Sequence, residues 1–452
     1  MTARGSFKSK FGVIAAVGGS VIGLGNIWRF PYIAGENGGG AFLFVYILVS
    51  LLIAVPILLS ELVIGRRTRG NTFGAFRTLT KPKRTLWPGI GLLGVLTAFM
   101  ISSFYMVISG WGVEFFLESI MNGFAGKGVE EIQTNFSSFI SSGTKPFIYM
   151  IVFVIGNYVI ARLGIEKGIE KFTKVLMPMM VVLMICLIIN SLRLPNAIEG
   201  VKFLFYPDFS KITISVILQA VGQAFFSLSL GMGAMITYGS YINKDVNLYR
   251  TAATVALCDV TVAILSGLVI FPSVFSFGIN PTSGPELVFI TLPNIFQQMT
   301  GGYFVSILFF FIIIVAAITS SISLIEVITA YISEELKVSR KKAVNISIAL
   351  VTITGGLCVN SMMPNSVIRI GGETLFDFFD NLTSVYTLPL GGLLISIFTG
   401  WFMDKKVLKG EITNYGTLGG NTAHLYKVAL FIIKFVAPVV ISLIFLDLLG
   451  II

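Results

Sequence analysis

Charged side chains are scarce in this chain. Only 12% of its 452 residues are Asp, Glu, Lys or Arg, and 55% are hydrophobic, whereas a soluble domain has about 25% charged residues. The three cysteines all lie in apolar segments, which argues against a disulfide or metal framework. There is no Walker loop, HExxH, CxxC or nucleophile elbow, so we expect neither an enzyme nor an ATP-driven pump. This composition predicts an all-α polytopic membrane protein.

Long apolar runs recur along the chain. A helix needs about 20 such residues to cross a bilayer, and eleven runs qualify: residues 11–33, 40–64, 89–121, 147–163, 169–191, 213–241, 250–278, 303–335, 343–361, 373–402 and 425–450. With alternate connections assigned to opposite sides, 24 of the 32 Lys and Arg residues fall on the side of the N-terminus. The positive-inside rule then places the N-terminus in the cytoplasm and the C-terminus outside a cell (inner or plasma) membrane. Because the basic residues are spread over many short loops, we expect no nucleic-acid partner.

Glycine interrupts two of these runs. The stretch Ala15–Gly40 has four glycines around Ser20–Leu24, and Gly222–Tyr241 has Gly231 and Gly233 close together. Each glycine in a helix interior is unfavourable by about 1 kcal/mol relative to Ala, and backbone freed in lipid must be buried or line a cavity. Either stretch alone could be a small-residue packing face. Together, in spans 1 and 6, they indicate broken helices in an inverted repeat with a site at the membrane midplane.

Three stretches carry a specific resemblance. They are GSVIGLGNIWRFPYIAGENGGGAF in span 1, QAFFSLSLGMG in span 6 and AAITSSIS in span 8. Together they resemble the neurotransmitter:sodium symporter family, over residues 4 to about 401, and especially its eleven-span prokaryotic members that carry tyrosine or several hydrophobic amino acids. The resemblance implies the 5+5 inverted-repeat (LeuT-like) bundle plus one extra C-terminal span. It also implies sodium-coupled uptake of hydrophobic or aromatic L-amino acids of the Tyr, Trp, Phe and Leu class by alternating access.

The predicted organisation is one transmembrane domain, 1–452. Repeat one covers about 11–191, repeat two about 213–402, and the extra span about 425–450. The rival functions are a non-transporting amino-acid sensor or a channel on the same fold, and a proton-coupled carrier. Intact Thr319 and Ser320 argue against proton coupling, because a basic residue near them would have replaced a sodium ion. The exact substrate, the ion stoichiometry and the oligomeric state stay open.

The resemblance implies a substrate site between the two broken spans. Amides at the start of the second half of span 1 would bind the substrate carboxylate with the Tyr105 hydroxyl, and carbonyls at the break in span 6 would accept from its ammonium group. Met232 stands where an aromatic residue is commoner, which favours bulky substrates. The implied substrate-binding residues are Val21, Ile22, Gly23, Leu24, Gly25, Ile101, Tyr105, Phe226, Ser229, Met232, Ser321 and Leu324.

Two sodium sites follow from the same resemblance, with the oxygen ligands that hard cations take. The first would use Val21, Asn26, Ser227 and Asp259 together with the substrate carboxylate. The second would use Gly19, Ile22, Ala316, Thr319 and Ser320.

Asp259 departs from the family pattern, in which Asn is usual. Residues that hold chloride in other members match Tyr46, Gln223 and Ser227, but Ala263 replaces a serine. We hypothesise that the Asp259 carboxylate supplies the negative charge, so that transport is chloride-independent. A protonated Asp259, which acts as a hydrogen-bond donor or carries a counter-transported proton, is the alternative.

Gates are implied on both sides of the site. Outside, Arg29 would pair with Asp380, with Asp377 as the rival partner and the rings of Phe226 and Tyr105 as the lid beneath. Inside, the matching residues are Arg4 and Glu334, with Tyr241 beside them.

Three further features lie toward the cytoplasmic side. Gly168 and Pro178 in span 5 match a G-x9-P pattern that marks local unwinding in the family, although an ordinary proline kink is the alternative. Glu61, close to Arg66 and Arg67, favours a structural ion pair. Glu326 replaces a more usual Gln and has no predicted role.

Overall fold

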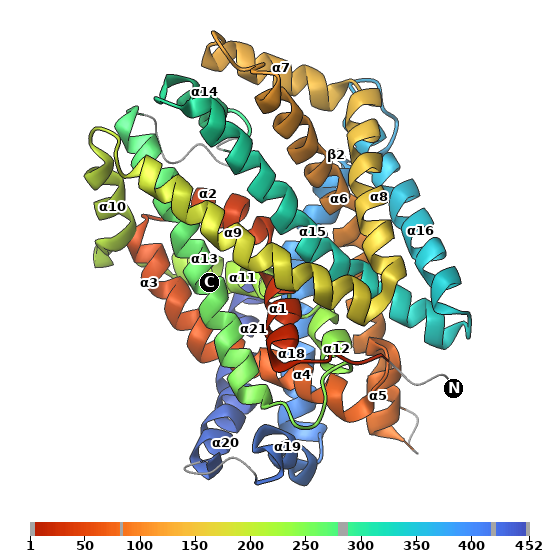
Figure 1. Cartoon of the computed structure of the whole chain (residues 1–452). Helices are drawn as coiled ribbons and strands as arrows, with labels where there is room; N and C mark the ends of the chain where they lie inside the picture. Colours follow the sequence, from red (N-terminus) through yellow and green to blue (C-terminus); the bar gives the residue numbers. More distant parts are fainter. Residues whose placement is uncertain (1–4, 82–84, 279–287, 417–421, 449–452) are drawn as a thin grey trace.

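The computed structural model describes residues 5–81, 85–278, 288–416 and 422–448. These residues form a bundle of helices with a single two-stranded hairpin at one end (Figure 1). Within them, eight helices are long and apolar enough to cross a membrane, and a ninth span is the bent pair Lys10–Val21 and Gly25–Glu36. The bundle confirms the predicted all-α polytopic class.

Each predicted span coincides with one or more helices. In chain order these are α1 (Lys10–Val21), η1 (Gly25–Arg29) and α2 (Phe30–Glu36); α3 (Gly40–Val49), η2 (Ser50–Ala54) and α4 (Val55–Thr68); α6 (Pro88–Ile120); α8 (Thr144–Gly164); η3 (Ile165–Glu170) and α9 (Lys171–Ser191); α11 (Ile214–Ser227) and α12 (Ala234–Gly239); α13 (Leu248–Ser276); α15 (Gly302–Glu335); α16 (Arg340–Ser361); α17 (Leu375–Asn381), η6 (Leu382–Thr387), α18 (Leu388–Ile397) and η7 (Phe398–Phe402); and α20 (Thr422–Phe431), η9 (Ile432–Val436) and α21 (Ala437–Leu448). In predicted span 6, the described residues include one apolar helix of intermediate length, Ile214–Ser227, which is too short to cross a membrane by itself. Predicted spans 4 and 5 form one continuous helical stretch, Thr144–Ser191.

The remaining elements lie in the connections between these helices. They are α5 (Thr72–Thr80), α7 (Val129–Ser141), α10 (Ala197–Phe205), η4 (Phe209–Lys211), α14 (Thr291–Gln298), β1 (Arg369–Ile370), β2 (Glu373–Thr374), α19 (Lys405–Ile412) and η8 (Asn414–Gly416). The strands pair antiparallel, Arg369 with Thr374. In Figure 1, α7 lies at one end of the bundle, and α5 and α19 lie toward the opposite end. The connecting elements therefore cover the two ends of the bundle.

The first helix break is short. Helix α1 ends at Val21, Ile22 adopts an extended conformation, and the two halves of the span are bent by 50°. The second half begins with a π-helical turn rather than an α-helical one. The glycine pattern predicted this break, although the helix persists into the Ser20–Leu24 stretch and ends at Val21, three residues before Leu24.

The second break covers six residues between α11 and α12. Ser229, Gly231 and Gly233 all have positive φ, at 54°, 82° and 75°. A side chain at Gly231 could not be accommodated, because its Cβ would lie 2.3 Å from the Leu388 carbonyl oxygen. The close approach of α18 therefore requires glycine at this position.

Candidate functional site

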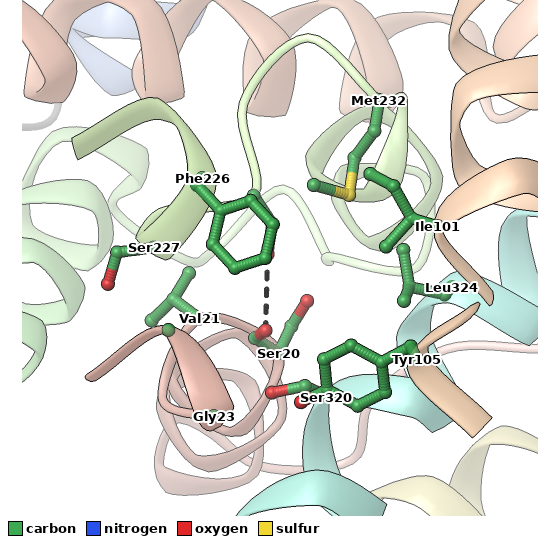
Figure 2. A pocket seen from close by; sticks show the side chains of 12 residues that line it. Ser20, Val21, Gly23, Ile101, Tyr105, Phe226, Ser227, Met232, Ser320 and Leu324 are labelled. Atoms are coloured by element: carbon green, nitrogen blue, oxygen red, sulfur yellow. Dashed lines mark hydrogen bonds between the residues drawn. The ribbon is translucent and has the colours of Figure 1, made fainter. Parts of the chain in front are cut away.

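A small cavity lies between the two helix breaks. Its volume is about 30 Å³, and it is lined by Ser20, Val21, Gly23, Gly25, Ile101, Tyr105, Phe226, Ser227, Ser229, Met232, Ser320 and Leu324. Figure 2 shows Phe226, Met232 and Ile101 on one side and the hydroxyls of Ser20, Tyr105 and Ser320 on the other. The cavity therefore has an apolar wall facing a wall of hydroxyl and backbone groups. In this conformation it has room for about one or two water molecules.

Nine of the twelve predicted substrate-binding residues line this cavity, and three do not. Ile22 and Leu24 contribute only backbone near it, and Ser321 points elsewhere, because its hydroxyl donates to Asn157 Oδ1 in α8 at 2.7 Å. Successive helix residues are rotated by about 100°, so Ser320 faces the cavity where Ser321 was predicted. Sequence reasoning did not select Ser20, although it lies in the matching stretch of span 1, because its carbonyl meets the Ser229 hydroxyl only where the two breaks pack together.

Tyr105 joins α6 to the break in span 1. Its hydroxyl accepts a hydrogen bond from the Leu24 N–H at 3.3 Å, and the Gly23 N–H donates to Asn26 Oδ1 at 3.2 Å. The Ser229 hydroxyl donates to the Ser20 carbonyl at 3.2 Å, drawn as the dashed line in Figure 2. The predicted carboxylate-binding groups are thus brought together, and the two broken spans are in direct contact.

The predicted first sodium site is organised around Asp259, which is fully buried in α13. Its Oδ1 accepts from Asn26 Nδ2 at 2.8 Å and from the Ser227 hydroxyl at 2.5 Å, and its Oδ2 accepts from the Tyr46 hydroxyl at 2.5 Å. Gln223 donates to the Gly25 carbonyl at 2.8 Å. Asn26 and Ser227 of the predicted sodium site therefore meet Tyr46 at one carboxylate, whereas Gln223 bonds to the neighbouring Gly25 carbonyl.

The predicted second sodium site lies between α1 and α15. The Ser320 hydroxyl is 3.3 Å from the Ile22 carbonyl oxygen and 3.5 Å from that of Gly19, and the Thr319 hydroxyl is 3.4 Å from Ile22 O and 2.9 Å from Ala316 O. All five predicted groups present oxygen to one small region. Such a set of neutral oxygens suits a hard monovalent cation.

Glu61 does not form the predicted ion pair. Its Oε1 accepts from the Gly231 N–H at 2.7 Å, inside the break of span 6. Arg66 pairs instead with Glu411 of α19 at 2.6 Å, where both side chains are buried. The fold separates residues that are close in the sequence, because five positions along a helix place Glu61 and Arg66 on different faces.

The outer gate residues are near each other without direct pairing. None of the ion pairs between described residues joins Arg29 to Asp380 or to Asp377. The guanidinium carbon of Arg29 lies 4.4 Å from the centroid of the Phe226 ring. Asp377 is engaged at the start of α17, where its Oδ2 accepts from the hydroxyl of the N-cap residue Thr374 at 2.6 Å and its N–H donates to the same hydroxyl at 3.0 Å. Arg29 therefore covers the lid residue Phe226 rather than a carboxylate.

Glu326 holds a network of hydrogen bonds beside the residues predicted for the inner gate. The Tyr241 hydroxyl donates to its Oε1 at 2.5 Å, and both terminal nitrogens of Arg340 donate to its carboxylate, at 2.7 and 2.6 Å. These contacts join the segment after α12 to α15 and α16. Arg4 lies outside the described residues, and Glu334 accepts two hydrogen bonds from Asn71, from its backbone N–H and its side-chain amide.

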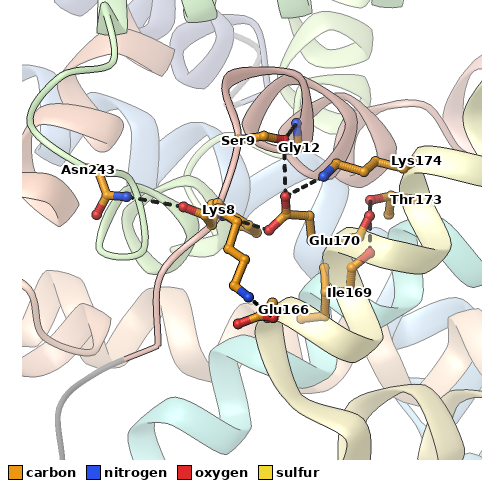
Figure 3. Close-up of polar contacts among 10 residues, drawn as sticks. Lys8, Ser9, Gly12, Glu166, Ile169, Glu170, Thr173, Lys174 and Asn243 are labelled. Atoms are coloured by element: carbon orange, nitrogen blue, oxygen red, sulfur yellow. Dashed lines mark hydrogen bonds and ion pairs between the residues drawn. The ribbon is translucent and has the colours of Figure 1, made fainter.

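The N-terminal segment docks on the start of span 5. Glu170, at the end of η3, accepts from the Lys8 N–H at 2.8 Å and from the Ser9 hydroxyl at 3.2 Å (Figure 3). Gly168 lies in the π-helical η3 and Pro178 inside α9, so the G-x9-P stretch is wound in this structure. Sequence reasoning did not identify Glu170, whose role depends on a contact between distant segments.

The chain is similar to known proteins along nearly its whole length. The model of the sodium:neurotransmitter symporter family matches residues 4–135 and 123–450. The sodium-dependent transporter YhdH of Bacillus subtilis (strain 168) is 38% identical over 446 residues, and a sodium-dependent transporter of Haemophilus influenzae is 37% identical over 459, with 98% of both chains covered in each case. The crystal structure of MhsT in complex with L-phenylalanine matches with a TM-score of 0.89 and 40% identity, over 98% of this chain and 100% of that one.

Proposed function

Because the chain belongs to the sodium:neurotransmitter symporter family, we propose that it takes up hydrophobic or aromatic L-amino acids together with sodium ions. Family membership makes it a multi-pass, sodium-coupled secondary transporter and not an enzyme. The proposal adds the substrate class, two sodium sites, independence of chloride and an N-terminus in the cytoplasm.

One observation carries the substrate class, namely the opposition of polar and apolar walls in the central cavity. The substrate carboxylate would replace the hydrogen bond between Tyr105 and the Leu24 N–H, and its side chain would lie against Met232 and Ile101. A volume of about 30 Å³ is too small for such a ligand. Entry therefore requires Phe226 and Met232 to move outward, and unbranched Met232 can do so easily.

Sodium coupling follows because the substrate and the sodium ions would share ligand atoms and would bind to the same helices. At the first site, the substrate carboxylate would join Asn26 and Ser227 as a ligand, so that ion and substrate stabilise each other directly. The three donors on Asp259 support an ionised carboxylate, since each hydrogen bond strengthens on a charged acceptor. This charge would take the place of chloride.

The second sodium ion would hold α1 against α15. Ser320 and Ile22 approach within 3.3 Å across this contact, and a cation between them would favour the closed arrangement. Unwinding at Gly168 would then admit water from the inside and release the ion. In each cycle the Glu326–Arg340 ion pair and the contact of Arg29 with the Phe226 ring would break in turn, one opening the inside and the other the outside.

The test is uptake by the purified chain in liposomes. An inward sodium gradient should drive accumulation of labelled L-tyrosine or L-leucine but not glycine, and replacement of chloride by gluconate should leave uptake unchanged. Binding without accumulation would favour a sensor. Accumulation driven by a proton gradient alone would contradict the proposed sodium sites.

A further inference from the structure

A second cavity lies at the end of the bundle where α6, α7 and α8 meet (Figure 1). Its volume is about 340 Å³, which is at the small end of the range of cavities that bind small molecules. It shares no lining residue with the central cavity. The closest pair along α6 is Tyr105 and Glu114, and nine residues of helix separate them by roughly 14 Å. The second cavity is therefore outside the central site.

A buried carboxylate faces this cavity without a complete set of partners. The Glu114 side chain lines it, is only 7% exposed and has an Oε2 atom with no hydrogen-bond partner. The Tyr149 hydroxyl of α8 approaches the same carboxylate. An unpaired buried carboxylate is unfavourable, so the cavity provides a place where a cationic group would be stabilised.

Charges of both signs line the cavity on different elements. Glu118 lies one turn after Glu114 on α6, Lys127 lies in the turn before α7, and Lys145 lies in the first turn of α8. None of these four side chains takes part in an ion pair among the described residues. The cavity can therefore offer a carboxylate and an ammonium group to the same ligand.

The remaining wall is aromatic. Phe115, Phe136 and Phe139 line the cavity. The Phe136 ring stacks on Phe289 with an interplanar angle of 7°, and Phe115 packs edge-on against Phe136 at 5.7 Å. Packing against several neighbours fixes these rings, and rigid aromatic surfaces suit an apolar or aromatic side chain.

We propose that this cavity binds a second hydrophobic amino acid as its zwitterion, outside the transport pathway. The ammonium group binds Glu114, the carboxylate binds Lys127 or Lys145, and the side chain packs on Phe136. This site would face the extracellular side and bind external substrate. That placement rests on the proposed function and on the proposed orientation of the chain, with its N-terminus in the cytoplasm. The binding itself needs no sodium, because none of the proposed sodium ligands lines the cavity.

The test measures binding of L-phenylalanine by saturation-transfer NMR to the full chain in lipid nanodiscs, in potassium chloride without sodium. The central site depends on sodium, so this condition isolates the second site. Glu114→Gln should weaken the sodium-independent binding roughly tenfold or more, since a hydrogen bond to a charged group is lost. Glu130→Gln is the matched control, because Glu130 is exposed on α7 and does not line the cavity.

Two analogues separate the chemistry of the ligand. Phenethylamine, which lacks the carboxylate, and 3-phenylpropionate, which lacks the ammonium group, should both bind more weakly than L-phenylalanine. In Lys145→Gln, the difference in affinity between L-phenylalanine and phenethylamine should be smaller than in the wild type. Equal binding of phenethylamine would overturn the zwitterion assignment. The absence of sodium-independent binding, or equal binding by Glu114→Gln, would overturn the site.

Folding and transport are monitored separately. Sodium-driven uptake in liposomes by Glu114→Gln should match the wild type, which shows that the variant is folded. Sodium-driven uptake could be absent in the wild type and in every variant while L-phenylalanine still binds without sodium and Glu114→Gln weakens that binding. In that case the proposed function would fail and the second site would stand.

Discussion

Replacement of Asp259 by Asn tests whether a fixed carboxylate takes the place of chloride. The carboxylate accepts hydrogen bonds from three buried side chains at 2.5 to 2.8 Å. Asn retains one acceptor oxygen, so the variant loses at least one hydrogen bond to a charged acceptor, which contributes about 1.5–3 kcal/mol. It also loses the negative charge beside the proposed first sodium ion. Together these losses predict sodium affinity roughly 10- to 100-fold weaker.

Chloride should partly restore this affinity in the variant. The Tyr46 and Ser227 hydroxyls would still point toward the position of the lost charge and could donate to an anion there. Ala263 lies one helical turn after Asp259 and is fully buried. Ala263→Ser adds a donor on the same face of α13, so the double variant should depend on chloride more strongly than Asp259→Asn.

The assay is sodium-dependent uptake in liposomes, titrated with sodium in chloride and in gluconate. The wild type should have the same sodium affinity in chloride and in gluconate. The sodium affinity of Asp259→Asn should be at least several-fold higher in chloride than in gluconate. Cys258→Ala, the preceding residue on α13, is the matched control and should behave as the wild type. An Asp259→Asn protein with unchanged sodium affinity in gluconate would refute the reasoning.

Three further substitutions test other parts of the structure. Arg66→Met leaves the buried Glu411 carboxylate unpaired and should lower the free energy of unfolding by about 3–5 kcal/mol. This loss would be measured as a lower Tm in detergent, whereas Arg67→Met, at an exposed position, should change the Tm little. Thr319→Val removes one hydroxyl from the proposed second sodium site and should reduce the Hill coefficient for sodium from near two toward one; an unchanged coefficient would count against that site. Glu326→Gln breaks the ion pair with Arg340 and should favour inward opening, measured as faster labelling of a cysteine introduced on the inner pathway; slower labelling would contradict the assigned role.

The helices and their two interruptions could be predicted from the sequence because their causes are local. Apolar runs of sufficient length must be helical in lipid, and the glycines at 231 and 233 disfavour a continuous helix wherever they occur. The family resemblance of spans 1, 6 and 8 also implied nine of the residues that line the central cavity. The helices and their breaks needed only residue types and spacing, and the site residues needed the resemblance to a known family.

Tertiary packing decided which polar groups meet. Glu61 and Arg66 are neighbours in the sequence, yet one binds the break in span 6 and the other a carboxylate of α19. Ser320 rather than Ser321 faces the central cavity because of the rotation of α15. The buried Glu114 is a candidate ligand only because α7 and α8 enclose a space beside it. The sequence by itself determined the class of protein and its helix breaks, whereas contacts between distant segments, which set each side chain's partners and burial, were decided by the tertiary structure.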